Sequence, residues 1–443
     1  MLSKTIRILR AARDMNSIMA DQYQIRSISA DELGGFLRVH EHAFATSPAA
    51  EVRRATVVRQ FEPDRSLAAF DAALPADEAL VGTTGVFSLR MTVPGAALPV
   101  AGVTAVSVLP SHRRRGVLRS LMHRQLGDIA AKGEEPIAAL WASETPIYAR
   151  YGYGRATAHA YFRFERGEGA MAATTPVDPA LTLRLAEPQK VTAELARVFE
   201  TVLPTQPGFF ARSSDDWWGR VLHDVPEERH GFSPLRCMLA EDGAGVRGYA
   251  LYTTRPGWHE ATSLPNGTLV IREVIAVDPA AGAALWHNLL TRDLVTRVTA
   301  EYRSAEDPLL YQLLDQRRAR VQVSDGIWVR VIDLQRALTR RAYSGPVDVV
   351  FEVTDELLAG NAGRWRLRVD APGGPGADVS CERTDEPADL ALDIRELGAA
   401  YLGGTRLGTL GAAGLVREFR PGALVRLSSA MTWDPAPWCP QNF

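Results

Sequence analysis

The feature that most constrains the fold is a strand that runs into three consecutive arginines and a glycine before a helix begins. Residues 103–108 alternate apolar and polar side chains, as in a strand with one buried face. Pro110 and Ser111 interrupt this strand, and apolar residues at helical spacing follow from Val117 to Ile129. A strand that passes directly into a helix in this way predicts a mixed α/β domain.

The start of this helix has the composition of a phosphate-binding site. The first N–H groups of a helix are free, and Gly116 lets an anion approach the backbone without a Cβ in the way. Arg113, Arg114 and Arg115 add positive charge, at a cost of about several tenths of a kcal/mol each unless an anion is bound there. We therefore expect a bound diphosphate. The alternative is a solvated surface turn.

Two motifs carry a resemblance to a known family. The segment from Arg113 to Leu118 resembles the acetyl-CoA pyrophosphate loop of the GNAT superfamily of N-acetyltransferases, with Leu118 where that pattern has a small residue. The segment 141–154 ends in Ile-Tyr-Ala-Arg-Tyr-Gly-Tyr-Gly, which is similar to the enhanced intracellular survival (Eis) family within that superfamily. The Arg-Arg-Arg-Gly-x-Leu form is usual in the Eis family, and the resemblance extends over nearly the whole chain.

The resemblance implies acetyl-CoA as the co-substrate, without a metal. Residues 103–108 and 137–143 are expected to part beside the arginines, so that the amides of the pantetheine arm could bond there like an added strand. The alternative is an ordinary pair of core strands. The expected acetyl-CoA-binding residues are Val106, Ser107, Val108, Arg113, Arg114, Arg115, Gly116, Val117, Leu118, Arg119, Ser143 and Glu144.

Moving an acetyl group to an amine needs an acid for the leaving thiolate and a base for the amine. Tyr148 stands just past the strand expected to flank the thioester, and by resemblance it matches the general-acid tyrosine of the Eis family. The alternative is that Tyr148 only packs, which is the expected role of Tyr151 and Tyr153. Glu41 and Phe44 are expected to line the acceptor pocket, from their position after the first strand.

The C-terminal segment, residues 433–443, holds two tryptophans and three prolines, which predicts a docked terminus rather than a frayed one. By resemblance, the terminal carboxylate, here that of Phe443, is the general base. The alternative is a terminus that only seals a contact between domains. The preceding residue, Asn442, is uncharged and cannot attract a cationic substrate as a carboxylate would.

The chain divides into four expected parts. Residues 1–23 are an extension that is disordered or not translated, with Met19 as a candidate start, and residues 24–164 form the catalytic GNAT domain. A linker and a degenerate GNAT-like domain occupy 165–335, and a sterol-carrier-like α+β domain with the docked terminus occupies 336–443. The fold class is therefore α/β (α+β), with tandem mixed sheets and flanking helices.

The second unit repeats the strand-to-helix layout without its arginines. Residues 275–279 overlay on 106–110, and Asp278 places a negative charge beside the second helix start, which is expected to run from Ala280 to Thr299. This copy should therefore not hold a diphosphate. The alternative is an unrelated α/β domain.

Charge and composition narrow the partners. A formal net charge of −2 makes nucleic acid or an acidic membrane surface an unexpected partner, and no run approaches the ~18 apolar residues of a membrane span. Cys237, Cys381 and Cys439 show neither metal spacing nor a disulfide framework, which fits a cytoplasmic protein.

The predicted function is transfer of an acetyl group to the amine of an aminoglycoside, a polyamine or a lysine side chain. The resemblance also implies that the chain forms a homohexamer. The alternatives are an N-acyltransferase that uses a longer-chain acyl-CoA, and a lipid-binding module in which the CoA-binding site at residues 113–118 is vestigial.

Overall fold

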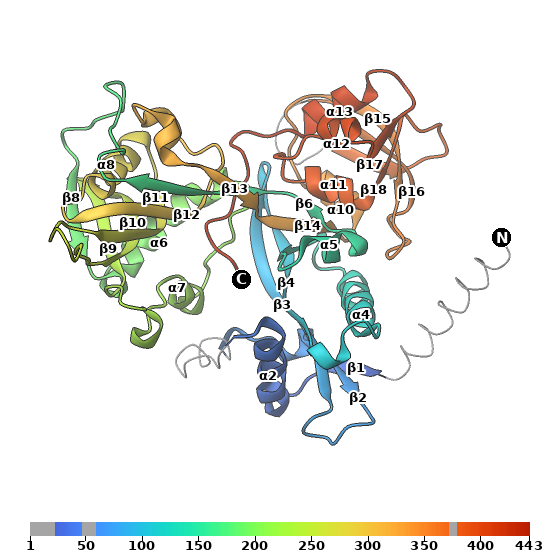
Figure 1. Cartoon of the computed structure of the whole chain (residues 1–443). Helices are drawn as coiled ribbons and strands as arrows, with labels where there is room; N and C mark the ends of the chain where they lie inside the picture. The colour runs from blue at the N-terminus through green and yellow to red at the C-terminus, as the bar shows by residue number, and fades with distance from the viewer. Residues whose placement is uncertain (1–22, 47–58, 372–378) are drawn as a thin grey trace.

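A computed structural model describes residues 23–46, 59–371 and 379–443. It contains three sheets with helices packed against them (Figure 1). The extension expected at 1–23 lies outside the described residues except for Tyr23, which begins the first strand.

The first sheet has seven strands. The helices α2 (Leu33–Phe44) and α4 (Val117–Lys132) cover its opposite faces, because α2 packs against Ala68 whereas α4 packs against the neighbouring Leu67 and Ala69. The strands β3 and β4 pair as a long antiparallel hairpin. In spatial order, the strands are β1 (Tyr23–Ser27), β2 (Leu67–Asp71), β3 (Leu80–Val93), β4 (Ala96–Val108), β5 (Ile137–Trp141), β14 (Ile327–Val331) and β6 (Gly154–Arg155). The helices are α2 (Leu33–Phe44), α4 (Val117–Lys132) and α5 (Thr145–Tyr148).

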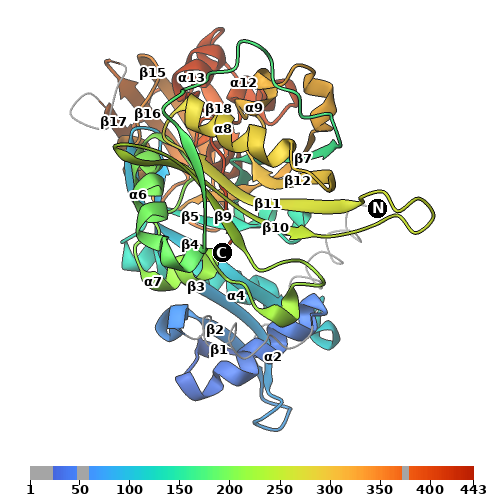
Figure 2. The same cartoon turned by 90° about the vertical axis from the view of Figure 1, so that its left-hand side faces the viewer.

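The second sheet also has seven strands, and α6 and α8 pack against its two faces (Figure 2). In spatial order, the strands are β13 (Gln322–Asp325), β7 (Ala158–Glu165), β12 (Val295–Arg303), β11 (Gly267–Ala276), β10 (Gly245–Arg255), β9 (Arg236–Asp242) and β8 (Thr182–Ala186). The helices are α6 (Thr192–Val202), α7 (Asp215–Val221), α8 (Pro279–Leu290) and α9 (Leu309–Gln312).

The two sheets exchange strands. The strand β7 follows β6 directly in the chain, yet it pairs with β12 and β13 of the second sheet. In return, β14 comes late in the chain and pairs antiparallel with β5 in the first sheet, from Ile327 opposite Trp141 to Val331 opposite Ile137. The strands β7 and β14 thus pair across the boundary expected at 164/165.

The prediction of a helix over residues 280–299 is wrong for its second half. The helix α8 ends at Leu290, and β12 begins at Val295. Thr291 is the C-cap of the helix, and residues 291–294 form a turn in which Leu294 has a φ of +64°, in the left-handed region. The apolar residues beyond this turn belong to a strand, in which Val298 and Ala300 are buried.

The third unit is a five-stranded sheet packed on four helices, as an α+β domain. Its strands are β17 (Val379–Arg383), β16 (Gly363–Val369), β15 (Val347–Thr354), β18 (Leu390–Asp393) and β19 (Val416–Glu418). Its helices are α10 (Leu334–Thr339), α11 (Ile394–Ala400), α12 (Leu407–Ala412) and α13 (Ala423–Met431).

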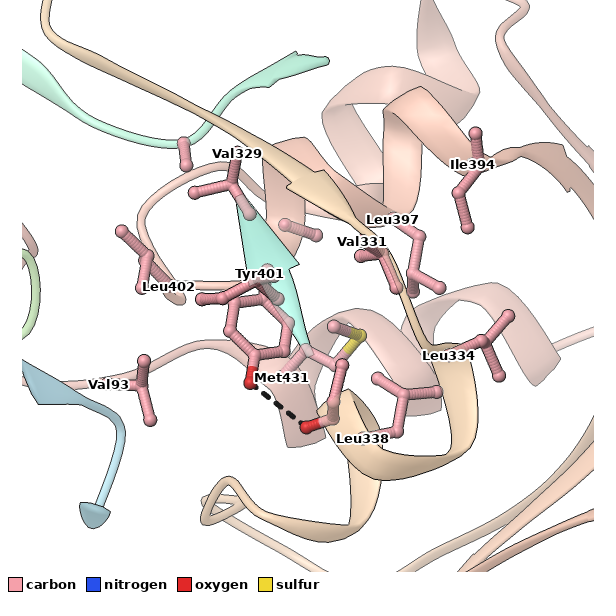
Figure 3. Close-up of a cluster of buried hydrophobic side chains, with 14 of the residues drawn as sticks. Val93, Val329, Val331, Leu334, Leu338, Ile394, Leu397, Tyr401, Leu402 and Met431 are labelled. Carbon is pink, nitrogen blue, oxygen red and sulfur yellow. Dashed lines mark hydrogen bonds between the residues drawn. The ribbon is translucent and has the colours of Figure 1, made fainter. Parts of the chain in front are cut away.

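The first sheet and the third unit share one hydrophobic core. Figure 3 shows Val329 and Val331 of β14 beside Leu397 of α11 and the ring of Tyr401. The Tyr401 hydroxyl donates a hydrogen bond to the Ala337 carbonyl at 3.0 Å. Because β14 belongs to the first sheet and packs against α11, the third unit is fixed to the first sheet.

Candidate active site

The N-terminus of α4 forms an open anion cradle. Its N-cap is Gly116, with a φ of +84° that favours glycine, and no side chain in the described parts of the chain caps the helix. A Cβ built on Gly116 would meet no atom within 4 Å, so the approach to the first-turn amides is free. Of the neighbouring cations, Arg113 donates from Nη2 to the Ala43 carbonyl at 3.2 Å. These features fit a diphosphate at the helix start.

The corresponding end of α8 is closed by a side chain. Oδ1 of Asp278 accepts hydrogen bonds from the N–H groups of Ala280 and Ala281, both at 3.0 Å, and its Oδ2 accepts from Arg247 at 2.8 Å. The Asp278 carboxylate thus accepts hydrogen bonds from the same first-turn N–H groups that would otherwise bind a phosphate. This geometry agrees with the interpretation that the second copy lacks a diphosphate site.

The strands β4 and β5 part beside the cradle, as the sequence predicts. Their parallel pairing runs from Val100 opposite Ile137 to Gly102 opposite Ala139 and then stops. Beyond this point Ala105 has a φ of +50°, next to a shift in the register of β3 and β4. A bulge of this kind re-aims a strand. The end of β4 is therefore free to pair with a ligand on its β5 side.

A cavity of about 650 Å³ lies between this opening and the helix start. Among the residues expected to bind acetyl-CoA, all line it except Arg115. Phe44, expected in the acceptor pocket, lines this cavity instead, whereas Glu41 lies one turn back on α2 and is not part of its wall. The lining residues are Ala43, Phe44, Val106, Ser107, Val108, His112, Arg113, Arg114, Gly116, Val117, Leu118, Arg119, Ser143, Glu144, Ile147, Tyr148, Arg150 and Tyr151.

Tyr148 reaches this cavity from the end of the short helix α5. Its side chain is 4% exposed, and burial raises its pKa above the usual 10, although a hydrogen bond with Ser143 acts in the opposite direction. The hydroxyl is therefore protonated at neutral pH and available as a proton donor. Tyr153 is fully buried and stacks edge-on against Tyr148 with ring centroids 6.1 Å apart, while Tyr151 lines the cavity.

The C-terminal residue is buried where β4 and β5 part. Phe443 is 8% exposed, and its ring packs edge-on against Phe210 with centroids 4.9 Å apart. The same ring lies so close to Gly102 that a Cβ on this glycine would be 3.1 Å from Cε2 of Phe443. The chain therefore ends beside the last paired residues of the two strands, between the two seven-stranded sheets (Figure 1).

Residues 206–212 anchor the terminal segment. Gln206 donates to the Ala436 carbonyl at 2.9 Å, and the backbone N–H of Trp438 donates to the Pro207 carbonyl at 3.2 Å. Nε of Arg212 donates to the side-chain oxygen of Gln441 at 2.6 Å. The docked terminus that the sequence predicts is present, and its partners come from the second unit.

A buried ion pair stabilises this anchor. The guanidinium of Arg212 donates to both carboxylate oxygens of Glu273, at 3.0 and 2.5 Å, and lies 3.9 Å above the ring of Phe199. The hydroxyl of Tyr249 donates to the same carboxylate at 2.5 Å. Burial and the negative Glu273 raise the pKa of Tyr249 well above its usual value, so this hydroxyl stays protonated.

A second cavity, of about 400 Å³, lies between α7, β11, β12 and the terminal segment. We call it the acceptor cavity. Sequence reasoning missed it, because its walls come from distant parts of the chain; the adjacent tryptophans at 217 and 218 were an available but weak signal. Its lining residues are Arg212, Trp217, Arg220, Val221, His223, Thr253, Val270, Ile271, Arg272, Glu273, Glu301, Tyr302, Pro440, Gln441 and Asn442.

Within 23–46, 59–371 and 379–443, no group of three or more His, Cys, Asp or Glu side chains is placed to hold a metal ion. In the same ranges no helix has the length and apolar character needed to cross a bilayer.

Family models match most of the chain. An acetyltransferase (GNAT) domain matches residues 24–156, a second acetyltransferase (GNAT) domain matches 208–331, and a sterol carrier protein domain matches 334–440. A Streptomyces coelicolor protein named as an uncharacterized N-acetyltransferase is 46% identical over 86% of this chain and 90% of its own length. N-acetyltransferase Eis of Mycobacterium tuberculosis is 33% identical over the same shares. The chain belongs to the Eis-like GNAT acetyltransferases.

The solved structure of Eis1 from Mycobacterium abscessus is similar throughout. It is 31% identical, with a TM-score of 0.77 over 95% of this chain and 100% of that one. The Eis-like family thus accounts for the tandem GNAT units and the sterol-carrier-like third unit, and the second unit is a GNAT domain rather than an unrelated one. The chain is an enzyme of the acetyltransferase class, whose GNAT members use acetyl-CoA as co-substrate.

Proposed function

We propose that this enzyme transfers the acetyl group of acetyl-CoA directly to a primary amine, with Tyr148 as the general acid and the C-terminal carboxylate of Phe443 as the general base. The observation that carries this proposal is the position of Phe443 against Gly102, where β4 and β5 part. Residues 106–108, at the end of β4 beyond the point where the two strands part, line the same cavity as Tyr148. The acid and the base thus flank one opening.

The residues of the Tyr148 cavity fit acetyl-CoA. The diphosphate lies at the open start of α4, near Arg113 and Arg114, and the pantetheine amides pair with the free edge of β4 over residues 106–108. This places the thioester toward the point where β4 and β5 part. Holding both reactants there supplies much of the rate enhancement.

The reaction forms a C–N bond and breaks the C–S bond of the thioester. The terminal carboxylate accepts a proton from the amine nitrogen as this nitrogen attacks the thioester carbon. The Tyr148 hydroxyl, which its raised pKa keeps protonated before the reaction, donates its proton to the departing sulfur. Positioned acid and base groups each contribute about 10²–10⁴-fold to such rates.

The proposed acceptors are an aminoglycoside, a polyamine or a lysine side chain, reached through the acceptor cavity. Relatives that are named N-acetyltransferases support an amine as the acceptor. Gln441 and Asn442 of the terminal segment are part of the wall of this cavity, which supports an approach of the acceptor to the terminal carboxylate from this side.

We also propose that the enzyme is a cytoplasmic homohexamer. Exposed apolar side chains near β13, namely Tyr311, Leu314 and Val323, support self-association, since such patches commonly mark contacts with other chains. Three cysteines without disulfide partners, Cys237, Cys381 and Cys439, fit a reducing compartment. Light scattering of the purified chain tests the hexamer.

The test of the activity is thiol release from acetyl-CoA across aminoglycosides, polyamines, lysine peptides and arylamines. Y148F should lower kcat by about 10²-fold or more while acetyl-CoA binding by calorimetry is unchanged. The matched control is Y161F, because Tyr161 lies on β7 in the second sheet, away from the cavity. Full activity of Y148F would contradict the assignment of the acid, and faster turnover of a longer acyl-CoA would contradict acetyl as the transferred group.

A further inference from the structure

The acceptor cavity contains a cation that is held in place without a carboxylate. Arg272 lies on β11, and its Nη1 donates to the backbone carbonyls of Val221 at 3.1 Å and His223 at 2.8 Å. These two bonds tie the guanidinium to the end of α7. Among the described residues, Arg272 forms no ion pair, and its Nε and Nη2 atoms donate to no protein acceptor.

The carboxylates nearest to Arg272 are engaged by other arginines. Asp224 accepts from Nε and Nη2 of Arg229 at 2.8 and 2.9 Å, and Glu273 accepts from Arg212. The positive charge of Arg272 is therefore not neutralised by a partner of its own. Its Nε–Nη2 edge has the fork geometry that matches a carboxylate.

The surroundings of Arg272 add a second cation and aromatic surface. Arg220 lines the same cavity, with its guanidinium 5.7 Å from the ring centroid of Trp217, which lies one helical turn before it. A ligand group at this end of the cavity meets two guanidinium groups and an indole. This combination favours an anionic group over an ammonium.

The acceptor cavity also has a negatively charged side chain in its wall, that of Glu301. Glu301 lies next to Tyr302 on β12, and the Tyr302 hydroxyl accepts a hydrogen bond from Nδ2 of Asn442 at 3.4 Å. Asn442 in turn precedes the terminal carboxylate of Phe443. An ammonium is thus favoured beside Glu301, while an anion is favoured at the Nε–Nη2 edge of Arg272.

We infer that the acceptor is a zwitterionic amine, with its amine at the terminal carboxylate and a carboxylate of its own bound by the Nε–Nη2 edge of Arg272. This inference rests on the proposed function and narrows its acceptor class. An acetylated product then loses the ammonium and keeps the carboxylate. Polycationic amines, which include aminoglycosides, lack the anion and bring positive charge to two arginines, so they react poorly.

The test uses acceptors that differ only in the anionic group. One pair is Nα-acetyl-lysine and its C-terminal amide, and the other is phenylalanine and phenylalaninamide. For at least one pair, kcat/KM measured by thiol release should be at least about tenfold higher for the carboxylate form, as expected for a charge-assisted bidentate contact. Spermidine and kanamycin serve as polycationic acceptors and should be slower than that carboxylate form.

Variants of Arg272 separate binding from structure. R272Q should reduce the carboxylate-to-amide ratio to about one, while R272K should retain part of it. The ratio is taken within each variant, so a general loss of folding does not change it. R236Q is the matched control, since Arg236 is an exposed arginine on β9 of the same sheet.

The possible outcomes separate the inference from the proposed function. Equal turnover of the carboxylate and amide forms by the wild type would overturn the inference and leave the acetyltransferase proposal intact. An R272Q variant that keeps the wild-type ratio would overturn it as well. Absence of thiol release with every acceptor, together with no binding of acetyl-CoA in calorimetry, would overturn both.

Discussion

Nε of Arg212 donates a hydrogen bond to the side-chain oxygen of Gln441 at 2.6 Å, which ties a buried ion pair of the second GNAT unit to the end of the chain. Gln441 stands two residues before the terminal carboxylate. In the proposed mechanism the terminal carboxylate is the base, and this bond is the contact by which the second unit would hold it in position.

Removing this bond should affect turnover more than folding. Q441A leaves Arg212 paired with Glu273, so we expect a loss of only about 1 kcal/mol in the free energy of unfolding. The displaced terminus should lower kcat by about tenfold or more without changing the affinity for acetyl-CoA. Steady-state kinetics and calorimetry measure these effects, with Q189A at an exposed position as the control. A normal kcat in Q441A would show that the anchor is not needed.

Extending the chain by one glycine should remove the base without changing any side chain. The ring of Phe443 is buried against Gly102 and Phe210, so an added residue must move the carboxylate away from its place. We expect kcat to fall by about 10²-fold or more, with acetyl-CoA binding unchanged. Thiol-release kinetics and calorimetry provide the measurement. Full turnover in the extended chain would assign the terminus to a purely structural role.

The charge at the start of α4 should determine the affinity for CoA. Arg114 lines the Tyr148 cavity, and R114Q removes a cation from the diphosphate site. We expect the dissociation constant for CoA to rise about tenfold. R124Q is a matched control, because Arg124 lies on the same helix and pairs with Asp128 on its exposed side. Isothermal titration of both variants tests this; equal affinities would count against the cradle.

A buried ion pair should be the main electrostatic contribution to the joint between the first and third units. Arg330 on β14 is fully buried, and its Nη2 donates to both oxygens of Asp355 at 2.7 and 2.8 Å. R330M leaves this carboxylate buried without its cation and should cost about 3–5 kcal/mol in urea unfolding. R366M breaks the exposed pair with Asp348 on the third sheet and should cost at most about 1 kcal/mol. Similar losses in both variants would contradict this assignment.

The segment after β7 should lose stability in acid. Hydrogen bonds from Arg320 and Arg318 lower the pKa of Glu168 from its usual 4.5 to about 2. A carboxyl with a lowered pKa contributes stability above its unfolded pKa and loses it as the pH falls to the folded value. The stability difference between wild type and E168Q should thus be full at pH 7 and vanish between about pH 4.5 and 2. E187Q, at an exposed pair, should show little difference at any pH.

The local features of the catalytic half could be predicted from the sequence because they depend on neighbouring residues. The helix from Val117 follows from its apolar periodicity and from the break at Pro110, and the parting of β4 from β5 was expected beside the arginines. The docked terminus follows from its tryptophans and prolines. The resemblance then supplied roles for Tyr148 and Phe443, which the packing around them makes testable.

Long-range pairing could not be predicted in the same way. The alternation of buried residues in β7 identifies a strand, but alternation carries no information about which sheet the strand joins. The acceptor cavity depends on residues as distant as Trp217, Arg272 and Asn442, which no spacing rule links. The prediction of a helix to Thr299 failed because residues 295–303 pair with other strands of the second sheet, a long-range contact that the local apolar pattern does not contain.

The exchange of β7 and β14 has a consequence for how the protein matures. The strand β14, which pairs with β5 in the first sheet, consists of residues 327–331. It leaves the ribosome only after almost all of the second GNAT unit has been synthesised. Until then the edge of β5 is unpaired and open to wrong partners. The first sheet therefore cannot be completed until β14 has been synthesised, and the edge of β5 must stay protected until then. A gene split between the two units would yield two fragments that each lack a strand.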